Sequence, residues 1–507
     1  MATTGSDLPP DMVCCIAERA DVGCRTRISA VCSLWRALVP AGLPQPWVLL
    51  QPAATTADDD GGDRESDLFR VLSLPANREL TLSPAFTSGC GVLGARCVGA
   101  GHGWLALVGA DLSVALHNPF TGRSVSLPPL ANHPMLKGGV RDDGTVLIRR
   151  ELTDDDDTNL DHVMAEYVRD NLVRKIVFSP APEQDDYFAV QLLVSHGENA
   201  PQYTMYARAG TTRWKTLRDK DGEPVKLVCD ALHVKGGTFL AVRRGLGDVY
   251  QLDLAAQGGV DDEDAFVYNA DNEEEDDDSD VYPPSFSKLA PQLYSRDASW
   301  YYPSWARGVH NHLVLVDGEL YQVWAKWGEV PAPEDYVQYG VIKEAGVVKC
   351  DLDEHTYLEV DERELDSWAV LVGANETVAV RAGDMPGLRG SCVYFIDGNL
   401  ENVACAFDLR TWGVEAVDCE MLQRAWPKGP WRGLSPQPVW FSPSYADAVA
   451  QGGSARPSRL SLPKGRHHER AQRNGVVSSE PTASVLKTRR SSGYMIMNQT
   501  AKTLMIN

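Results

Sequence analysis

The glycine-rich stretch GCGVLG at residues 89–94 is the motif of this chain that comes closest to known cofactor chemistry, because it satisfies the pattern G-x-G-x-x-G. A dinucleotide site needs this loop to open a helix within a βαβ unit, so that the pyrophosphate meets the helix N-terminus. Here the loop continues into ARCVGAG at residues 95–101, which predicts a flexible turn and then a strand. We therefore expect no nucleotide site at this position.

The remaining reactive side chains form no recognised catalytic or metal-binding pattern. Phosphate-binding P-loops, H-E-x-x-H and G-x-S-x-G are absent, and none of the 11 cysteines belongs to a C-x-x-C pair. His310 and His312 alternate along one predicted strand, but two imidazoles alone make a poor metal site, and packing or solvent exposure explains them better. We expect no catalytic residue, no cofactor and no metal.

The composition is that of an acidic protein of 507 residues, which is too long for one ordinary core. Its 70 acidic and 48 basic residues give a formal net charge of −22, and this argues against nucleic acid as the main partner, because phosphate binding requires a local excess of Lys and Arg. No basic segment followed by an apolar core opens the sequence, and no apolar run approaches the roughly 18–20 residues of a membrane span. We expect a cytoplasmic and/or nuclear protein without a membrane partner.

Residues 68–448 show the residue pattern typical of β-strands. Short runs rich in Val, Leu, Tyr, Phe and Trp alternate with Gly, Asp, Asn and Pro turns, and no long amphipathic helix interrupts them. A strand–turn–strand pattern recurs at 115–128, 347–360 and 404–417. So many antiparallel strands favour a β-propeller, and about six to eight blades of roughly 40–50 residues would fit. The predicted fold class is mainly β, with a small helical domain at the N-terminus.

Three segments depart from this pattern of β-strands. Acidic tracts lie near 152–162 and 257–282, and neither has the ligand spacing of an EF-hand, so both are predicted to be disordered inserts. Residues 452–507 are rich in Ser, Arg, Pro and Gly and contain ten Lys or Arg and two Glu, which predicts a disordered basic tail.

The N-terminal residues 5–46 predict a small helical domain. Asp7 to Asp11 place acidic residues and prolines where a first helical turn favours them. In RISAVCSLWRALVP (27–40), apolar residues recur at the spacing of one helix face, and prolines follow. Two short helices bury little apolar surface between them. They are either a cap on the next domain or a docking element that a partner covers.

This N-terminal segment resembles a plant F-box. The shared elements are Leu8-Pro9 before an Asp-led helix and the V-C-x-x-W-R pattern from Val31 to Arg36. The sequence departs from the family at Val22-Gly23, where members often have a Leu-containing helical turn, so the middle helix is expected to be short.

The body resembles the KIB-type β-propeller that follows the F-box in many plant proteins. The likeness is carried by AVLVGANETVAVRAGDMPGLRGSCVYFID at 369–397, with its G-x-N-x-[ST], PGL-[KR]-G and C-[IV]-YF steps, and by QPVWFSPS at 437–444. The segments at 118–130 and 230–254 also fit. The resemblance covers most of 68–445.

Together the two resemblances imply a substrate-recognition subunit of an SCF-type E3 ubiquitin ligase. The F-box would dock on a Skp-type adaptor and through it on cullin, while the propeller binds an unknown target protein. Such a subunit carries no catalytic residue of its own. The resemblance assigns the adaptor contact to Leu8, Pro9, Met12, Ile16, Ile28, Val31, Cys32 and Trp35.

Two other functions stay open at the level of the sequence. The first is an interaction protein without ligase activity, whose propeller sequesters a regulatory protein, and the departure at Val22-Gly23 favours it slightly. The second is a propeller enzyme whose catalytic groups converge on the central channel from distant blades, an arrangement that spacing along the chain cannot reveal.

Overall fold

The computed structural model describes residues 8–19, 35, 38, 47–50, 70–73, 78–81, 95–119, 123–149, 160–180, 182–183, 185–193, 203–219, 223–243, 247–255, 285–288, 309–330, 338–361, 363–373, 375–385, 387–396, 405–417 and 439–441. The predicted acidic inserts lie almost wholly outside these residues, as does the predicted basic tail.

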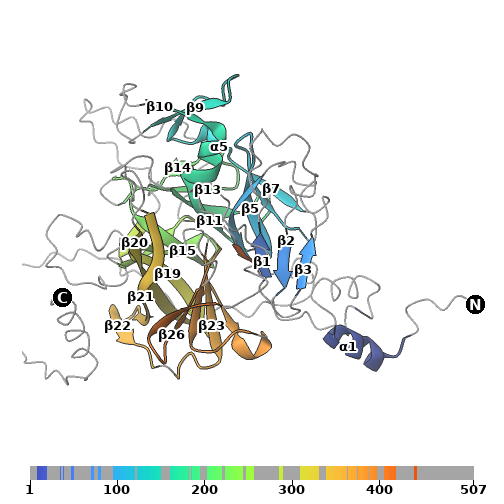
Figure 1. Ribbon diagram of the computed structural model, residues 1–507. Coiled ribbons are helices and arrows are strands. Elements are labelled where there is room, and N and C mark those ends of the chain that lie inside the picture. Colours follow the sequence, from blue (N-terminus) through green and yellow to red (C-terminus); the bar gives the residue numbers. More distant parts are fainter. Residues whose placement is uncertain are drawn as a thin grey trace, which may run out of the picture. The chain divides into compact units, whose positions relative to one another are not determined.

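The described strands form seven sheets, six of which follow one plan of four or five strands in radial order. We call these six sheets blades 1 to 6 (Figure 1). Blade 1 consists of β28 (Val439–Phe441), β1 (Trp47–Leu50), β2 (Arg70–Ser73) and β3 (Arg78–Thr81). Blade 2 consists of β4 (Arg96–Gly101), β5 (Trp104–Val108), β6 (Val114–His117) and β7 (Ser124–Leu127). Blade 3 consists of β11 (Val173–Phe178), β12 (Phe188–Leu193), β13 (Thr204–Arg208) and β14 (Lys215–Thr216).

The remaining blades continue this order along the chain. Blade 4 consists of β15 (Val228–Lys235), β16 (Thr238–Arg243), β17 (Val249–Asp253) and β18 (Ser285–Lys288). Blade 5 consists of β19 (Val309–Val316), β20 (Glu319–Val330), β21 (Gln338–Asp351) and β22 (Thr356–Glu359). Blade 6 consists of β24 (Val378–Arg381), β23 (Trp368–Val372), β25 (Cys392–Phe395), β26 (Cys405–Asp408) and β27 (Gly413–Ala416). Its β23 and β25 run parallel, whereas neighbouring strands of the other blades are antiparallel.

The burial of each strand follows from its radial position. Strand β5 lies inside blade 2 and is covered by a neighbour on each face, so all of WLALV is buried and reads as a continuous apolar run. Strand β7, at the rim of the same blade, has SVSL with alternating exposed and buried residues. The recurring pattern of the sequence corresponds to hairpins β6–β7, β21–β22 and β26–β27, the outer pairs of blades 2, 5 and 6.

Six separate hydrophobic clusters lie between neighbouring blades and close the ring. Leu105 belongs to the cluster between blades 1 and 2, Phe239 to that between blades 3 and 4, and Leu240 to that between blades 4 and 5. Phe407 lies between blades 5 and 6, and Tyr394 between blades 6 and 1. Each buried apolar side chain of this size contributes about 1.5–3 kcal/mol, so the clusters provide most of the force that holds the blades together.

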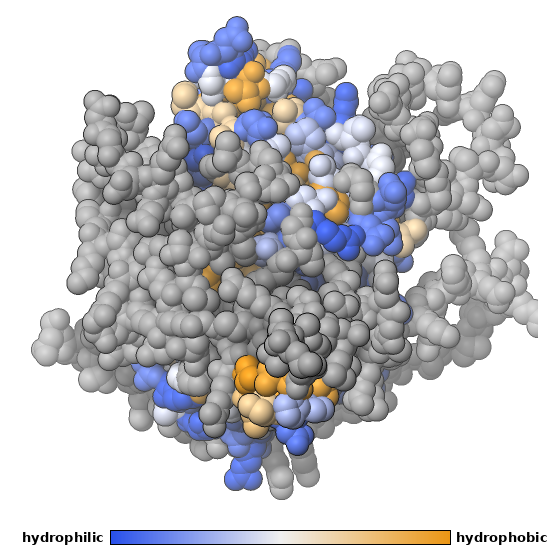
Figure 2. Space-filling model, turned by 90° about the vertical axis from the view of Figure 1, so that its right-hand side faces the viewer, coloured by the Kyte–Doolittle hydropathy of each residue, from blue (hydrophilic) through white to orange (hydrophobic). Residues whose placement is uncertain are grey.

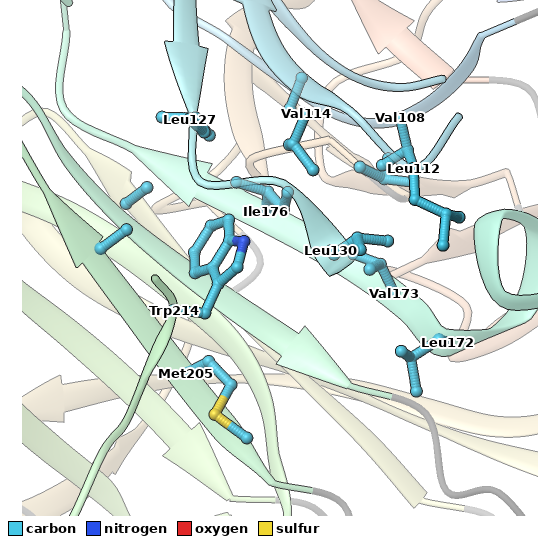
Figure 3. Close-up of a cluster of buried hydrophobic side chains, with 14 of the residues drawn as sticks. Val108, Leu112, Val114, Leu127, Leu130, Leu172, Val173, Ile176, Met205 and Trp214 are labelled. Atoms are coloured by element: carbon cyan, nitrogen blue, oxygen red, sulfur yellow. The ribbon is translucent and has the colours of Figure 1, made fainter. Parts of the chain in front are cut away.

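The sixth cluster, between blades 2 and 3, also covers a side sheet outside the ring. This side sheet is made of β10 (Leu160–Met164), β9 (Thr145–Arg149) and β8 (Leu136–Lys137), and it is followed by the short helices α5 (Ala165–Tyr167) and η4 (Val168–Leu172). Its Ile148 packs in the cluster together with Leu130 and Trp214. Figure 3 shows Trp214 among these apolar side chains, and its Nε1 donates a hydrogen bond of 2.7 Å to the carbonyl oxygen of Pro128.

The ends of the ring come from distant parts of the sequence. β1 pairs with β2 on one side and with β28 on the other, with Trp47 opposite Phe441. Blade 1 is therefore assembled from both ends of the propeller region, and this pairing leaves no open edge at the closure point. The predicted mainly β fold with a propeller is confirmed, and the described residues form six blades, at the lower limit of the predicted six to eight.

The N-terminal segment contains helix α1 (Pro10–Arg19) and a small core of its own. Val13 and Ala17 pack against Trp35, and Leu8 and Leu38 cover the same cluster. Helix α1 starts at a proline and carries Asp11 in its first turn, as the sequence predicts, because neither residue costs a helical hydrogen bond there.

Candidate functional site

Helix α1 exposes one apolar stripe to solvent. Val13 and Ala17 are buried in the N-terminal core, whereas Met12 and Ile16, on the other side, are 51% and 44% exposed. Cys15 is also exposed and lies on the same face at helical spacing. Helix α1, of 10 residues, thus presents large apolar side chains on its solvent face.

The predicted adaptor residues fall into three groups in the structure. Met12, Ile16 and Pro9 are exposed and free for a partner, and Leu8 is half-buried. Trp35 is only 9% exposed, because it forms the core that holds α1 in place, so it does not belong to the exposed stripe. Ile28, Val31 and Cys32 lie outside the described residues. The sequence analysis missed Cys15, although its spacing from Met12 would have placed it on the stripe.

A second polar site lies where the inner strands of the blades meet. Strands β28, β4, β11, β15, β19 and β24 contact one another in this order and form the inner wall of the ring. Polar side chains from five of the six blades converge here. We call this group the axial polar cluster and define it as Lys175, Asp230, His312, Thr377, Glu376, His102 and His233.

Asp230 of β15 is the hub of the axial polar cluster. Its Oδ1 accepts hydrogen bonds from Lys175 Nζ at 2.5 Å and from the Ala231 N–H at 2.9 Å. Its Oδ2 accepts from the Leu313 N–H at 3.1 Å and from Thr377 Oγ1 at 3.2 Å. One buried carboxylate thus joins blades 3, 4, 5 and 6.

The charge of Asp230 is retained in spite of its burial. Burial alone would raise the pKa of Asp230, but the ammonium group of Lys175 and the hydrogen bonds hold this pKa well below its usual range. Removing one partner of a buried, hydrogen-bonded ion pair costs about 3–5 kcal/mol, because the other charge stays buried without compensation. The pair therefore makes the relative position of blades 3 and 4 specific.

The two histidines of β19 contact side chains of neighbouring blades. His312 is buried, its Nδ1 lies 3.5 Å from Asp230 Oδ2, and burial lowers its pKa more than Asp230 raises it. His310 accepts a hydrogen bond of 2.9 Å from Arg174 Nη2 on β11. The sequence analysis assigned both residues to packing or solvent exposure, and the contacts found are packing and hydrogen bonding between blades.

His102 and Glu376 form a second ion pair in the axial polar cluster. The distance between His102 Nε2 and Glu376 Oε2 is 2.9 Å, and the N–H of Glu376 donates to the carbonyl oxygen of Ala100 at 2.8 Å. Burial lowers the pKa of His102, but the charge of Glu376 and its hydrogen bond outweigh this effect and raise the pKa above its ordinary value. His233 approaches edge-on, with 6.3 Å between the ring centroids of His233 and His102.

The charged groups of the axial polar cluster are paired with one another across the blades. No group of three or more His, Cys, Asp and Glu residues in the described part of the chain is arranged to hold a metal ion. The sequence analysis missed Lys175, Asp230 and Glu376, since their partners are far away along the chain. The available signal was a lone charge within an otherwise apolar strand, as in VCDALHV.

The glycine-rich motif at 89–94 lies outside the described residues, but the residues after it form strand β4, as expected. A Cβ atom at Gly99 would lie 2.2 Å from the carbonyl oxygen of Ile176 on β11. A Cβ atom at Gly101 would lie 2.7 Å from Glu376 Oε2. These glycines serve close packing at the centre of the ring, and no helix follows the motif. Among the described residues, no helix has the length and apolar character needed to cross a membrane.

Comparison with known proteins identifies the ring. The family model of the KIB1-4 β-propeller matches residues 71–410. No curated protein matches the chain. Among solved structures, similarity is found to a GH43_1 enzyme from Xanthomonas citri, at 10% identity and a TM-score of 0.22, over 58% of this chain and 82% of that one. Apo AztD from Citrobacter koseri is similar at 10% identity and a TM-score of 0.25, over 79% of this chain and 99% of that one.

A third similar structure is the dihydro-heme d1 dehydrogenase NirN in complex with DHE, at 11% identity and a TM-score of 0.20, over 64% of this chain and 56% of that one. All three superpositions are too loose to bear on function.

Proposed function

Because the chain belongs to the KIB1-4 β-propeller family, whose propeller indicates a protein-interaction function, we propose that it is the substrate-recognition subunit of an SCF-type E3 ubiquitin ligase. In this function the N-terminal segment docks on a Skp-type adaptor and the propeller binds a target protein. The protein performs no chemistry itself. It raises the local concentration of the target beside the enzyme that carries ubiquitin.

The observation that carries this proposal is the exposed stripe of α1. Met12 and Ile16 stay in water although the same helix buries Val13 and Ala17, so the helix has a core of its own and a second apolar face without a partner in the described chain. Covering such side chains in a groove is worth roughly 1.5–3 kcal/mol each, before the cost of association.

Co-purification with a Skp-type adaptor tests the docking step. The double variant Met12→Asp/Ile16→Asp should lose the adaptor, with affinity at least about tenfold weaker, because it places two charges on the buried side of the interface. Trp412→Asp is the matched control, since Trp412 is 58% exposed but lies on blade 6. A stripe variant that still binds the adaptor like the unaltered protein would contradict the docking model. Trp35 is a poor target for this test, because its truncation would disturb the N-terminal core.

Reconstituted ubiquitylation distinguishes the proposed function from the non-ligase interaction protein. A substrate receptor should support ubiquitin transfer to a protein captured by the propeller, and the stripe variant should abolish this transfer while target capture persists. A protein that only sequesters a regulator would bind the target without transfer in either form. For a receptor of this kind we expect a cytoplasmic and/or nuclear location.

A further inference from the structure

Arg96 is a half-buried arginine whose guanidinium has no hydrogen-bond partner in the described part of the chain. It is the first residue of β4, one of the inner strands of the ring. Its Nε is buried without an acceptor, and its other two guanidinium nitrogens donate no hydrogen bond to any described residue. A buried charged donor without an acceptor costs free energy, so this side chain requires an explanation.

The strand register places Arg96 on the side of blade 2 that faces blade 3. Arg96 pairs with Val108 of β5, and directly paired residues share one face of a sheet. Val108 belongs to the hydrophobic cluster between blades 2 and 3. The guanidinium of Arg96 therefore lies on the side of η4, the short helix that precedes the inner strand of blade 3.

Helix η4 is a single turn of π-helix, a rare form that often occurs at functional sites. Its buried Val168 and Leu172 fix it on the cluster between blades 2 and 3. Arg169 and Asp170 lie between these two residues and form a bidentate ion pair. The distances are 2.7 Å from Arg169 Nε to Asp170 Oδ1 and 2.9 Å from Arg169 Nη2 to Asp170 Oδ2.

Both members of this ion pair act on the charge of Arg96. Burial lowers the pKa of Arg96, the carboxylate of Asp170 raises it, and the guanidinium of Arg169 lowers it. Both oxygens of Asp170 already accept hydrogen bonds from Arg169, so this carboxylate compensates Arg96 only at a distance. Glu166 also acts on Arg169, but its side chain is exposed on α5. The donors of Arg96 are therefore left without an acceptor.

The ion pair of η4 can be reached from solvent. The side chains of Arg169 and Asp170 are 13% and 14% exposed. Figure 2 shows hydrophilic side chains among apolar ones at the top of the view, where the side sheet and α5 lie in Figure 1. The surface in this part of the molecule is thus mixed in polarity and does not exclude a charged ligand.

We propose that Arg96 and Arg169 bind a small oxyanion, the carboxylate or phosphate group of a ligand, between the start of β4 and η4. Unmet donors select this occupant, because the N–H groups of a guanidinium match the oxygens of a carboxylate or phosphate two at a time. A cationic or apolar ligand would leave the donors of Arg96 unmet, and water would bring no opposite charge. The proposal is independent of adaptor docking by α1, because it concerns the propeller alone.

Thermal unfolding of the full chain in chloride, acetate and inorganic phosphate at equal ionic strength tests this site. The midpoint of the unaltered protein should rise by about 1–3 °C as acetate or phosphate approaches saturation. A response to phosphate alone would identify phosphate as the ligand group, and a response to acetate alone would identify a carboxylate. Phosphate also stabilises proteins because it is excluded from their surface, so the comparison with variants decides the test.

Arg96→Met is the test variant. In chloride it should be at least as stable as the unaltered protein, because it removes a buried charge that has no hydrogen-bond partner. Its midpoint should not show the additional rise in acetate or phosphate. Arg96→Lys should keep part of the rise, since an ammonium group retains the charge but not the paired donors. The control Arg213→Met removes the same charge at an exposed arginine between β13 and β14 and should respond like the unaltered protein.

Three results would overturn the proposal. An equal rise in Arg96→Met and in the unaltered protein would show that the anions act on the whole surface. A large loss of stability of Arg96→Met in chloride would show that the guanidinium is already satisfied inside the fold. A midpoint of the unaltered protein that is the same in all three salts would show that no oxyanion binds at this site.

Discussion

At the scale of single residues, the centre of the ring depends on side chains that are either very small or fully paired. Gly99 allows β4 to approach the backbone of β11. Lys175 forms an ion pair with Asp230, and both side chains are buried away from water. Both features serve the packing of neighbouring blades.

We predict that Gly99→Ala destabilises the ring by about 1–3 kcal/mol, because the added methyl group forces β4 away from β11. The clash would be with the backbone oxygen of Ile176, which no rotamer change can relieve. Urea unfolding monitored by tryptophan fluorescence measures the change in free energy. Gly139→Ala is the control, since a Cβ atom there meets nothing within 4 Å, and a comparable loss in both variants would contradict the explanation.

At the scale of elements, the inner strands are joined by polar contacts as well as by apolar packing. The pair His102–Glu376 connects blade 2 directly to blade 6, although blade 1 lies between them in the ring. Blade 1 is the sheet that the two ends of the propeller region assemble. The pair therefore supports the closure point from its two flanks.

This pair predicts a dependence of stability on pH. The pKa of His102 is raised in the folded state above its ordinary value of 6.5, so its contribution is complete below pH 6.5 and is lost as the pH rises through the folded pKa. Burial raises the pKa of Glu376, but the charge and hydrogen bond of His102 outweigh this effect, so the net pKa lies below its ordinary value of 4.5. The carboxylate therefore stays charged in the folded protein at and above pH 4.5. The pair is thus strongest between about pH 4.5 and 6.5.

Urea unfolding of the unaltered protein and of His102→Gln, measured from acid to alkaline pH, checks this prediction. The advantage of the unaltered protein should be largest near pH 6 and should shrink as the pH rises. His162→Gln, at an exposed histidine of the side sheet, should show no such trend. A difference between the unaltered protein and His102→Gln that is the same at all pH values would assign His102 to packing alone.

At the scale of the whole molecule, six blades and six clusters form a closed ring, so each blade is covered on both sides by its neighbours. The closure depends on β28, whose Phe441 is fully buried between blades 1 and 2.

We predict that Phe441→Ala lowers the free energy of unfolding by about 3–5 kcal/mol, because it leaves a cavity at the closure point. In calorimetry the variant should still unfold in one cooperative transition, since the clusters couple neighbouring blades. Trp412→Ala, at a side chain that is 58% exposed, should change stability little. A separate early transition with the remaining blades unchanged would mean that blade 1 unfolds independently of the ring.

Much of the fold could be predicted from local sequence. Apolar strands with turn residues between them, such as WLALV and TFLAVR, indicated antiparallel sheets, and the recurring hairpin pattern indicated blades. The start of α1 also followed from the prolines and acidic residues that a first helical turn favours. These features were predictable because turn preference and side-chain alternation act between residues close together in the chain.

By itself the sequence determined that the chain would form a propeller-like series of hairpins with a helical segment in front. Only the tertiary structure decided that β28 completes blade 1, that Trp35 is a core residue of the N-terminal segment, and that Lys175 and Asp230 meet. It also decided which side of the side sheet faces water. The physical reason is that ring closure and charge pairing depend on distances between residues far apart in the chain, and these distances are set only when all six blades have packed.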